Sequence, residues 1–276
     1  MSGKDKKVKK NFIFGLDTFG DLPTDESDTL LSHPEALRQV VDEAVLADKL
    51  GVDAIALGEH HRSEYSISSP EMVLAGIASK TERILLASGV TVLSSDDPVR
   101  VFQRFATLDA LSNGRAQVIL GRGSFTESFP LFGYDLKDYE KLFEEKIELF
   151  SQLLKETPVT WSGETRAALD GADVFPKTAN GLKTMVGVGG SPQSVVRAAH
   201  YGFPLMLAII GGSPERFVPY VELYRRAAKE FGTTEHPVGM HSPGFIADTD
   251  EEAKRIAWPR YKKSIDRIGK TRGWPP

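Results

Sequence analysis

Short apolar runs alternate along the chain with longer segments in which apolar residues recur every three or four positions. The runs predict buried strands and the periodic segments predict amphipathic helices. Strands are expected at 11–19, 52–57, 84–93, 116–120, 185–188, 204–210 and 237–247. Helices are expected at 34–50, 70–80, 98–112, 137–155, 192–199, 214–231 and 250–268. Such alternation predicts parallel strands covered by helices.

Two architectures fit this alternation, because a closed barrel and an open doubly wound sheet both place helices outside parallel strands. The segment 156–182 interrupts the pattern. Its apolar residues around Trp161 are followed by the turn-forming Gly163 and Gly171, which predicts an inserted hairpin. The pattern ends with the helix at 250–268. A barrel built from it is expected to lack the final strand and helix, or the chain is a fragment.

Composition favours one large α/β domain and excludes several kinds of partner. The chain has 276 residues, 41% of them hydrophobic, and its net charge of −4 gives no basis for binding nucleic acid or an anionic membrane. Residues 1–10 are basic and lack the apolar core of a signal peptide, so we expect a disordered start. No apolar run approaches the roughly 20 residues that span a bilayer. The absence of cysteine excludes disulfides and fits a cytoplasmic protein.

The stretch 183–202 carries the clearest chemical signal. An apolar run breaks at Gly189 and Gly190, and Ser191, followed by proline, then opens a helix. A strand, a glycine turn and a helix N-terminus present free N–H groups to an anion, and the hydroxyls of Ser191 and Ser194 could add donors. The stretch contains no acidic residue that would repel the anion. It predicts a phosphate site, although an ordinary turn with a serine cap would use the same residues.

Other polar residues lie in or directly after the carboxyl-terminal parts of the predicted strands, where ligands bind in parallel α/β folds. In chain order they are Asp17, Glu59, His60, His61, Ser88, Gly89, Arg122, Ser124 and His241. Adjacent histidines point in opposite directions on a strand end and lack the spacing of zinc ligands, so no metal site is predicted. An unperturbed histidine has a pKa of about 6.5, which suits proton transfer. A histidine satisfied by its neighbours, or an arginine paired with a loop carboxylate, is the alternative.

Three segments, 47–65, 84–135 and 186–217, resemble the bacterial-luciferase-like flavin-dependent monooxygenases. The likeness is collinear and runs from about Phe12 to the end of the chain. It implies a single luciferase-like (β/α)8 TIM-barrel domain over 11–276, with an insertion at about 156–182, assembled as a homodimer. It also implies that reduced FMN binds at the carboxyl ends of the strands.

The resemblance assigns the flavin phosphate to specific residues. Gly190, Ser191 and Ser194 match the family's phosphate loop, in agreement with the anion site inferred from the residues alone. Arg122 matches the arginine beside that phosphate, and Ser124 matches a neighbouring contact. These five residues are therefore expected to bind the cofactor.

The resemblance also assigns the flavin ring and the proton chemistry. Ser88, Gly89 and Val90 match the stretch behind the isoalloxazine ring, where the family often has a non-prolyl cis peptide, expected here between Gly89 and Val90. Val188, at the end of the strand before the phosphate loop, is expected among the cofactor contacts. His60 matches the active-site histidine that acts as a base or proton relay.

The implied function is a monooxygenase that uses reduced FMN, delivered by a separate flavin reductase, and O₂ to oxidise a small organic substrate. Two alternatives remain: an oxidoreductase that uses the deazaflavin F420, and a non-catalytic flavin-binding protein. Two positions depart from the luciferases themselves, which have an acidic residue at Gly190 and a cysteine at Gly121. These departures argue against luciferase activity.

Overall fold

The computed structural model describes residues 12–25, 27, 29–123 and 125–272. The main sheet within these residues contains β1 (Gly15–Thr18), β2 (Ala54–Leu57), β3 (Leu85–Ser88), β4 (Thr91–Val92), β5 (Ala116–Gly121), β8 (Lys183–Val188), β9 (Leu205–Ala208) and β10 (Gly239–His241). The strand order is β1-β2-β3-β5-β8-β9-β10, and every neighbouring pair is parallel. The expected disordered start at 1–10 lies outside the described residues.

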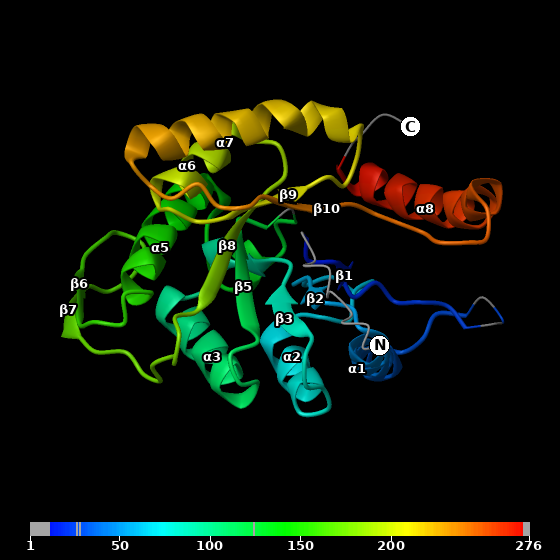
Figure 1. The fold of residues 1–276 in the computed structure, drawn as a ribbon, viewed down its shortest axis with the longest axis horizontal. Helices are drawn as coiled ribbons and strands as arrows, with labels where there is room; N and C mark the ends of the chain where they lie inside the picture. Colours follow the sequence, from blue (N-terminus) through cyan, green and yellow to red (C-terminus); the bar gives the residue numbers. More distant parts are fainter. Residues whose placement is uncertain (1–11, 26, 28, 124, 273–276) are drawn as a thin grey trace, which may run out of the picture.

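Helices cover the outer side of this sheet. They are α1 (His33–Leu50), α2 (Pro70–Ala78), α3 (Pro98–Leu111), α4 (Ser128–Leu131), α5 (Tyr139–Leu153), α6 (Pro192–His200), α7 (Val218–Phe231) and α8 (Asp250–Arg272). Figure 1 shows α1, α2, α3 and α5 following one another around the strands, with α6 and α7 on the opposite side. No helix in the described part of the chain is long and apolar enough to cross a membrane.

Side chains alternate between the two faces of the parallel strands, as the period of two requires. On the inner face Ala87, Ile119 and Met185 form a small buried cluster, against which Ala56 and Met206 pack. The outward-facing side chains of the same strands belong to the larger core beneath the helices. Both faces of the sheet are therefore apolar, which explains why the strands read as continuous apolar runs.

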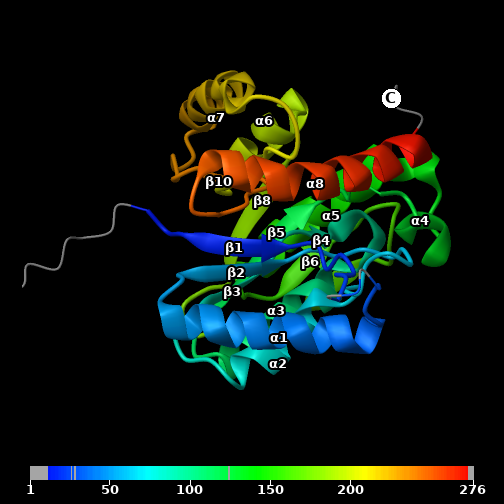
Figure 2. The same cartoon turned by 90° about the vertical axis from the view of Figure 1, so that its right-hand side faces the viewer.

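The sheet curves into a nearly closed parallel barrel, which confirms the predicted fold class. β1 pairs with β2 and β10 pairs with β9, but β1 and β10 do not pair with each other. Helix α8 lies beyond these two strands, on the side where the barrel is open (Figures 1 and 2). The position that a final strand would fill is thus bordered by β1 and β10.

The strands at the two borders are shorter than predicted. The expected strands 11–19 and 237–247 reduce to β1 and β10, because each has a hydrogen-bonded neighbour on one side only. The expected strand 84–93 is divided into β3 and β4 by a cis peptide between Gly89 and Val90, as the resemblance predicted. The short helix α4 was not predicted.

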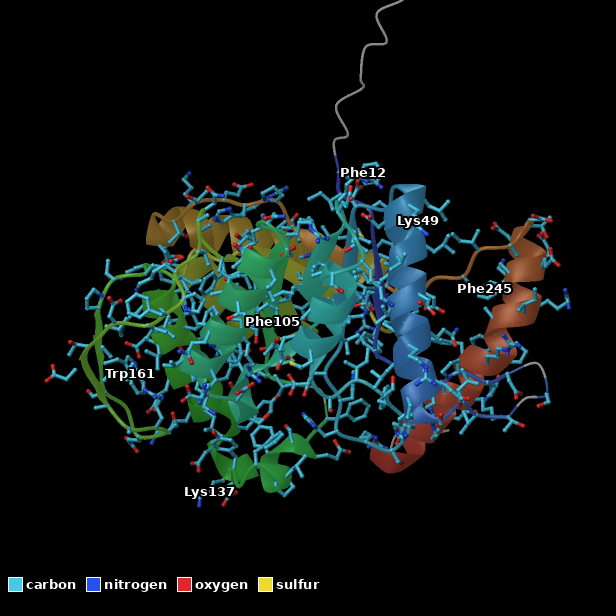
Figure 3. All side chains as sticks on the ribbon, turned by 90° about the horizontal axis from the view of Figure 1, so that it is seen from below. Phe12, Lys49, Phe105, Lys137, Trp161 and Phe245 are labelled. Carbon is cyan, nitrogen blue, oxygen red and sulfur yellow. The ribbon has the colours of Figure 1, made fainter. Side chains whose placement is uncertain are left out.

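Between α5 and β8 the chain forms a separate two-stranded antiparallel sheet. It consists of β6 (Val159–Trp161) and β7 (Leu169–Ala172). Figure 3 shows Trp161 at the margin of the molecule, where its side chain is buried beside Gly163. The hairpin therefore packs on the outside of the barrel, against α5.

Candidate functional site

The turn between β8 and α6 forms an open cradle. Ser191 caps α6, and its hydroxyl oxygen accepts a hydrogen bond from the Ser194 backbone N–H at 3.4 Å. Gly190 has a φ of +130°, a conformation that side chains rarely adopt. A Cβ placed on Gly189 would meet no atom within 4 Å, and one placed on Gly190 would meet only the Tyr220 hydroxyl, at 3.9 Å. The first turn of α6 thus faces free space, as an anion site requires.

Two arginines lie beside this cradle and share one carboxylate. Arg122 is hydrogen-bonded to one oxygen of Glu140, whose other oxygen lies 3.5 Å from Arg197. Arg197 also lies 3.5 Å from the Ser194 hydroxyl and pairs with Glu144. The structure therefore links Arg122 to Ser194 through Glu140 and Arg197. The sequence did not indicate either of these two connecting residues.

The carboxylates on α5 change the charge of this corner. The stretch 183–202 itself contains no acidic residue, but Glu140 and Glu144 approach it from another helix. The Glu140 side chain is 65% exposed, and exposed ion pairs contribute only about 0–1 kcal/mol. Hydrogen bonds to charged groups contribute about 1.5–3 kcal/mol. A phosphate can therefore replace Glu140 as the partner of Arg122.

Two of the predicted cofactor contacts, Ser88 at the end of β3 and Val188 at the end of β8, are buried. The Ser88 hydroxyl is fully buried, accepts from the Ile119 N–H at 3.2 Å and accepts from the Thr91 hydroxyl at 2.9 Å. Val188 is 1% exposed and belongs to the core under the helices. Neither residue is therefore exposed to a ligand in this structure.

Gly121 leaves room for its neighbour across the sheet. A Cβ on Gly121 would lie 2.4 Å from a methyl carbon of Val90, and one on Gly187 would lie 2.7 Å from the other methyl carbon. A side chain at either position would displace Val90, the residue that follows the cis peptide. A cysteine at position 121 would therefore require Val90 to move.

His60 lies in an aromatic pocket. Its ring stacks on Tyr65 with centroids 4.2 Å apart, and the rings of Phe19 and Phe125 lie at 5.4 Å. Burial lowers the pKa of His60 from 6.5 to about 4, although a hydrogen bond with the Phe19 backbone opposes this effect. The expected titration near neutral pH is therefore wrong, because desolvation disfavours the charged imidazole. The buried Nδ1 atom has no hydrogen-bond partner.

The low pKa of His60 makes stability depend on pH. Between pH 6.5 and pH 4 the unfolded chain binds a proton at His60 that the folded chain does not. The free energy of unfolding should therefore fall with decreasing pH, by at most about 1.4 kcal/mol per pH unit and about 3 kcal/mol in all. Urea unfolding of wild type and His60→Gln from pH 7.5 to pH 4.5 measures this, since the other titrating groups cancel in the difference. Parallel curves for the two proteins would contradict the assignment.

The neighbouring His61 has a structural partner. Its Nε2 atom lies 2.9 Å from Glu59, and the second oxygen of Glu59 accepts the backbone N–H of Val92 at 2.8 Å. This pair joins the ends of β2 and β4. Groups of three or more side chains suited to a metal ion are not found among the described residues.

A second histidine comes close to His60 from the opposite border of the barrel. His241 at the end of β10 has its Nδ1 atom 3.1 Å from a carboxylate oxygen of Asp17 on β1. The Phe19 ring lies 5.4 Å from the His241 ring as well as from that of His60. Asp17 and His241 lie in strands at opposite ends of the sequence, and nothing in the sequence indicated that they would pair.

Not every expected contact can be placed. Ser124 lies outside the described residues. Two hollows elsewhere on the surface, one along α1 and one between α6 and α7, lie away from the strand ends. The candidate site is therefore defined by the cradle before α6, the end of β3 and the pocket of His60.

Comparisons with known proteins identify the family of this chain. A family model for luciferase-like monooxygenases matches residues 18–271. The alkanal monooxygenase alpha chain of Photorhabdus luminescens is 25% identical over 233 residues, which cover 81% of this chain and 62% of that relative. The chain thus spans less than two thirds of the length of this curated relative.

Solved structures share the fold. A monooxygenase from Streptomyces bottropensis has a TM-score of 0.81 at 24% identity, covering 93% of this chain and 79% of its own. The oxygenating constituent of 3,6-diketocamphane monooxygenase from Pseudomonas putida, in complex with FMN, has a TM-score of 0.74 at 21% identity. The match covers 96% of this chain and 80% of that structure. An F420-dependent secondary alcohol dehydrogenase has a TM-score of 0.67 at 20% identity, and the match covers 84% of this chain and 68% of that structure. Since the family model spans most of the chain, this protein belongs to the luciferase-like monooxygenase family.

Proposed function

We propose that this chain is a flavin-dependent monooxygenase, which uses reduced FMN from a separate reductase and O₂ to oxidise a small organic substrate. The observation that carries the proposal is the open cradle at Gly189 and Gly190, with Ser191 and Ser194 at its rim and Arg122 beside it. Membership of the luciferase-like family and the FMN complex of a structural neighbour support the choice of cofactor.

The residues of the cradle fit the phosphate of FMN. Backbone N–H groups of the turn before α6, together with that of Gln193, would bind the phosphate oxygens, with the positive end of the helix dipole behind them. The N–H groups of Ser194 and Val195 already donate to Ser191. The Tyr220 hydroxyl donates to the Gly190 carbonyl at 2.9 Å and so holds the loop open from α7. Arg122 would add a fixed positive charge. Bound reduced FMN would supply the two electrons with which one atom of O₂ enters the substrate and the other becomes water.

His60 would act at the reacting end of the site. Its neutral ring presents an unpartnered Nδ1 atom, which can accept a proton or a hydrogen bond from the substrate. Tyr65, Phe19 and Phe125 hold the ring on three sides. These aromatic side chains would also exclude water, which strengthens polar interactions within the pocket.

F420-dependent hydride transfer is a second candidate, because one observation favours it. The phosphodiester of F420 carries one negative charge at neutral pH, whereas the phosphate monoester of FMN carries up to two. Glu140 and Glu144 beside the cradle repel a doubly charged phosphate more strongly than a singly charged one. An F420-dependent structural neighbour has the same fold.

Binding distinguishes the two cofactors. Purified protein is titrated separately with FMN, reduced FMN and F420, followed by fluorescence and by the absorbance retained after desalting. We expect binding of FMN in at least one redox state and negligible binding of F420. Tight F420 binding without FMN binding would reverse the assignment. Bound flavin without O₂ consumption on any of a panel of small substrates would favour a non-catalytic flavin-binding protein.

A further inference from the structure

The two borders of the open barrel are joined by one pair of side chains. Asp17 on β1 and His241 on β10 lie on strands that share no backbone hydrogen bonds, yet their side chains meet at 3.1 Å. Both are largely buried, with 23% of the Asp17 side chain and 18% of the His241 side chain exposed. A surface ion pair of this length would contribute little, but this one lies inside the mouth of the barrel.

The pair also faces the candidate site. A Cβ placed on Gly89 would lie 3.0 Å from the second carboxylate oxygen of Asp17, so Asp17 lies directly over the end of β3. The Phe19 ring lies 5.4 Å from the His241 ring and 5.4 Å from the His60 ring. Phe19 therefore contacts both imidazoles at the mouth of the barrel.

Each imidazole has one ring nitrogen that is buried without a partner. In His60 this atom is Nδ1, and in His241 it is Nε2, because Asp17 binds the Nδ1 atom of His241. A buried polar atom without a partner is costly in a folded protein. Such an atom is retained where a ligand or a reacting group supplies the missing hydrogen bond. Here two such nitrogens belong to imidazoles that both contact the Phe19 ring.

The surroundings of the two rings differ in charge. The Asp17 carboxylate raises the pKa of His241, while burial lowers the pKa of His60 to about 4. His61 and Arg62 oppose a charge on His60, and Glu127 favours it. Of the charged groups around the pair, Asp21 faces Asp17 from the following loop. Groups whose pKa values are moved apart within one site commonly divide the acid and base roles.

We propose that His241, oriented by Asp17, donates a proton into the pocket that it borders together with His60 and Phe19. This proposal rests on the proposed monooxygenase function. The Nε2–H bond of the imidazolium breaks, a new O–H bond forms on the oxygen that leaves as water, and His241 remains as a neutral imidazole paired with Asp17. Solvent then returns a proton to Nε2. Asp17 is a positioning residue, because it acts through His241.

The first test follows the histidines themselves, in the protein without flavin. Long-range ¹H–¹⁵N NMR spectra of protein labelled at histidine are recorded from pH 5 to pH 9, and the signals are assigned with His60→Gln and His241→Gln. We expect His241 to titrate above 6.5 and His60 to stay neutral across this range. Asp17→Asn should lower the pKa of His241 by about one unit or more and leave His60 unchanged. A pKa of His241 at or below 6.5, or one that Asp17→Asn does not move, would overturn the proposal.

The second test separates proton donation from closure of the barrel. With reduced FMN and O₂, the basic limb of the pH profile of turnover should move to lower pH in Asp17→Asn, by the amount that NMR measures for His241. His241→Gln should lose that limb together with most of the turnover. His33→Gln, at the exposed start of α1, is the matched control and should change neither. A lower melting temperature with an unmoved limb would mean a structural role and overturn the proposal.

The two proposals can fail separately. If the wild-type protein binds no flavin, the monooxygenase assignment fails, while the NMR titrations still decide whether Asp17 holds His241 protonated. If flavin binds and turns over but His241→Gln is fully active, the monooxygenase stands and the proton donor does not.

Discussion

Replacing His60 with glutamine should lower turnover with reduced FMN and O₂ by about 100-fold or more, the range in which a positioned acid or base contributes. Glutamine preserves polarity and approximate size but cannot relay a proton between two ring nitrogens. The Nδ1 atom of His60 is buried and has no hydrogen-bond partner in the protein, so it is free to bond a reacting group. The measurement is oxygenated product formed per reduced FMN consumed, at pH 7, over a panel of small organic substrates.

His61→Gln is the matched control for this prediction. His61 follows His60 directly, but its Nε2 atom bonds Glu59 and so supports the junction of β2 and β4. This variant should retain most of its turnover. FMN affinity should be unchanged in His60→Gln, because the residues that would bind the phosphate lie elsewhere. Full turnover in His60→Gln with bound flavin would remove His60 from the mechanism.

Replacing Arg122 with methionine should weaken FMN binding by about 10- to 100-fold, since hydrogen bonds to charged groups contribute about 1.5–3 kcal/mol. Methionine keeps the length of the aliphatic stem, which matters because the guanidinium lies 5.3 Å from the Tyr139 ring centroid. In the wild type, FMN must compete with Glu140 for Arg122, and the variant lacks this competition. The resulting gain in affinity is small, because 65% of the Glu140 side chain is exposed. Fluorescence titration of the wild type and the variant measures the change.

Riboflavin, which lacks the phosphate, is the internal control. Its affinity should be the same in wild type and Arg122→Met if the arginine acts on the phosphate alone. Arg38→Met, at an exposed position of α1, removes one positive charge far from the cradle and should change neither affinity. An equal loss of FMN and riboflavin binding would show that Arg122 supports the ring or the fold instead.

The phosphate corner could be read from the chain because its parts are contiguous. The strand end, both glycines, the serine cap and the helix are consecutive in sequence, and each follows a local rule. The structure places Gly190 at positive φ and uses Ser191 as the cap, as those rules require. The alternation of apolar runs and amphipathic segments likewise determined the parallel sheet and its covering helices, because burial on both faces demands that pattern.

Two properties depended on the tertiary structure because they arise between elements distant in sequence. Glu140 reaches Arg122 and Arg197 from α5, and no local pattern indicates that approach. The pKa of His60 falls because rings from three separate segments remove it from water. The residue types were visible in the sequence, but their charge states were not.

The sequence alone determined the order of strands and helices and the residues near the carboxyl ends of the central strands, because each apolar run stops where burial stops. It extended the two border strands too far. Only the tertiary structure decided whether those ends meet. Asp17 and His241 stand near opposite ends of the chain, and they pair because the sheet curves until β1 and β10 face each other. Curvature accumulates from the twist between successive strands, so it belongs to the assembled sheet and to no single segment.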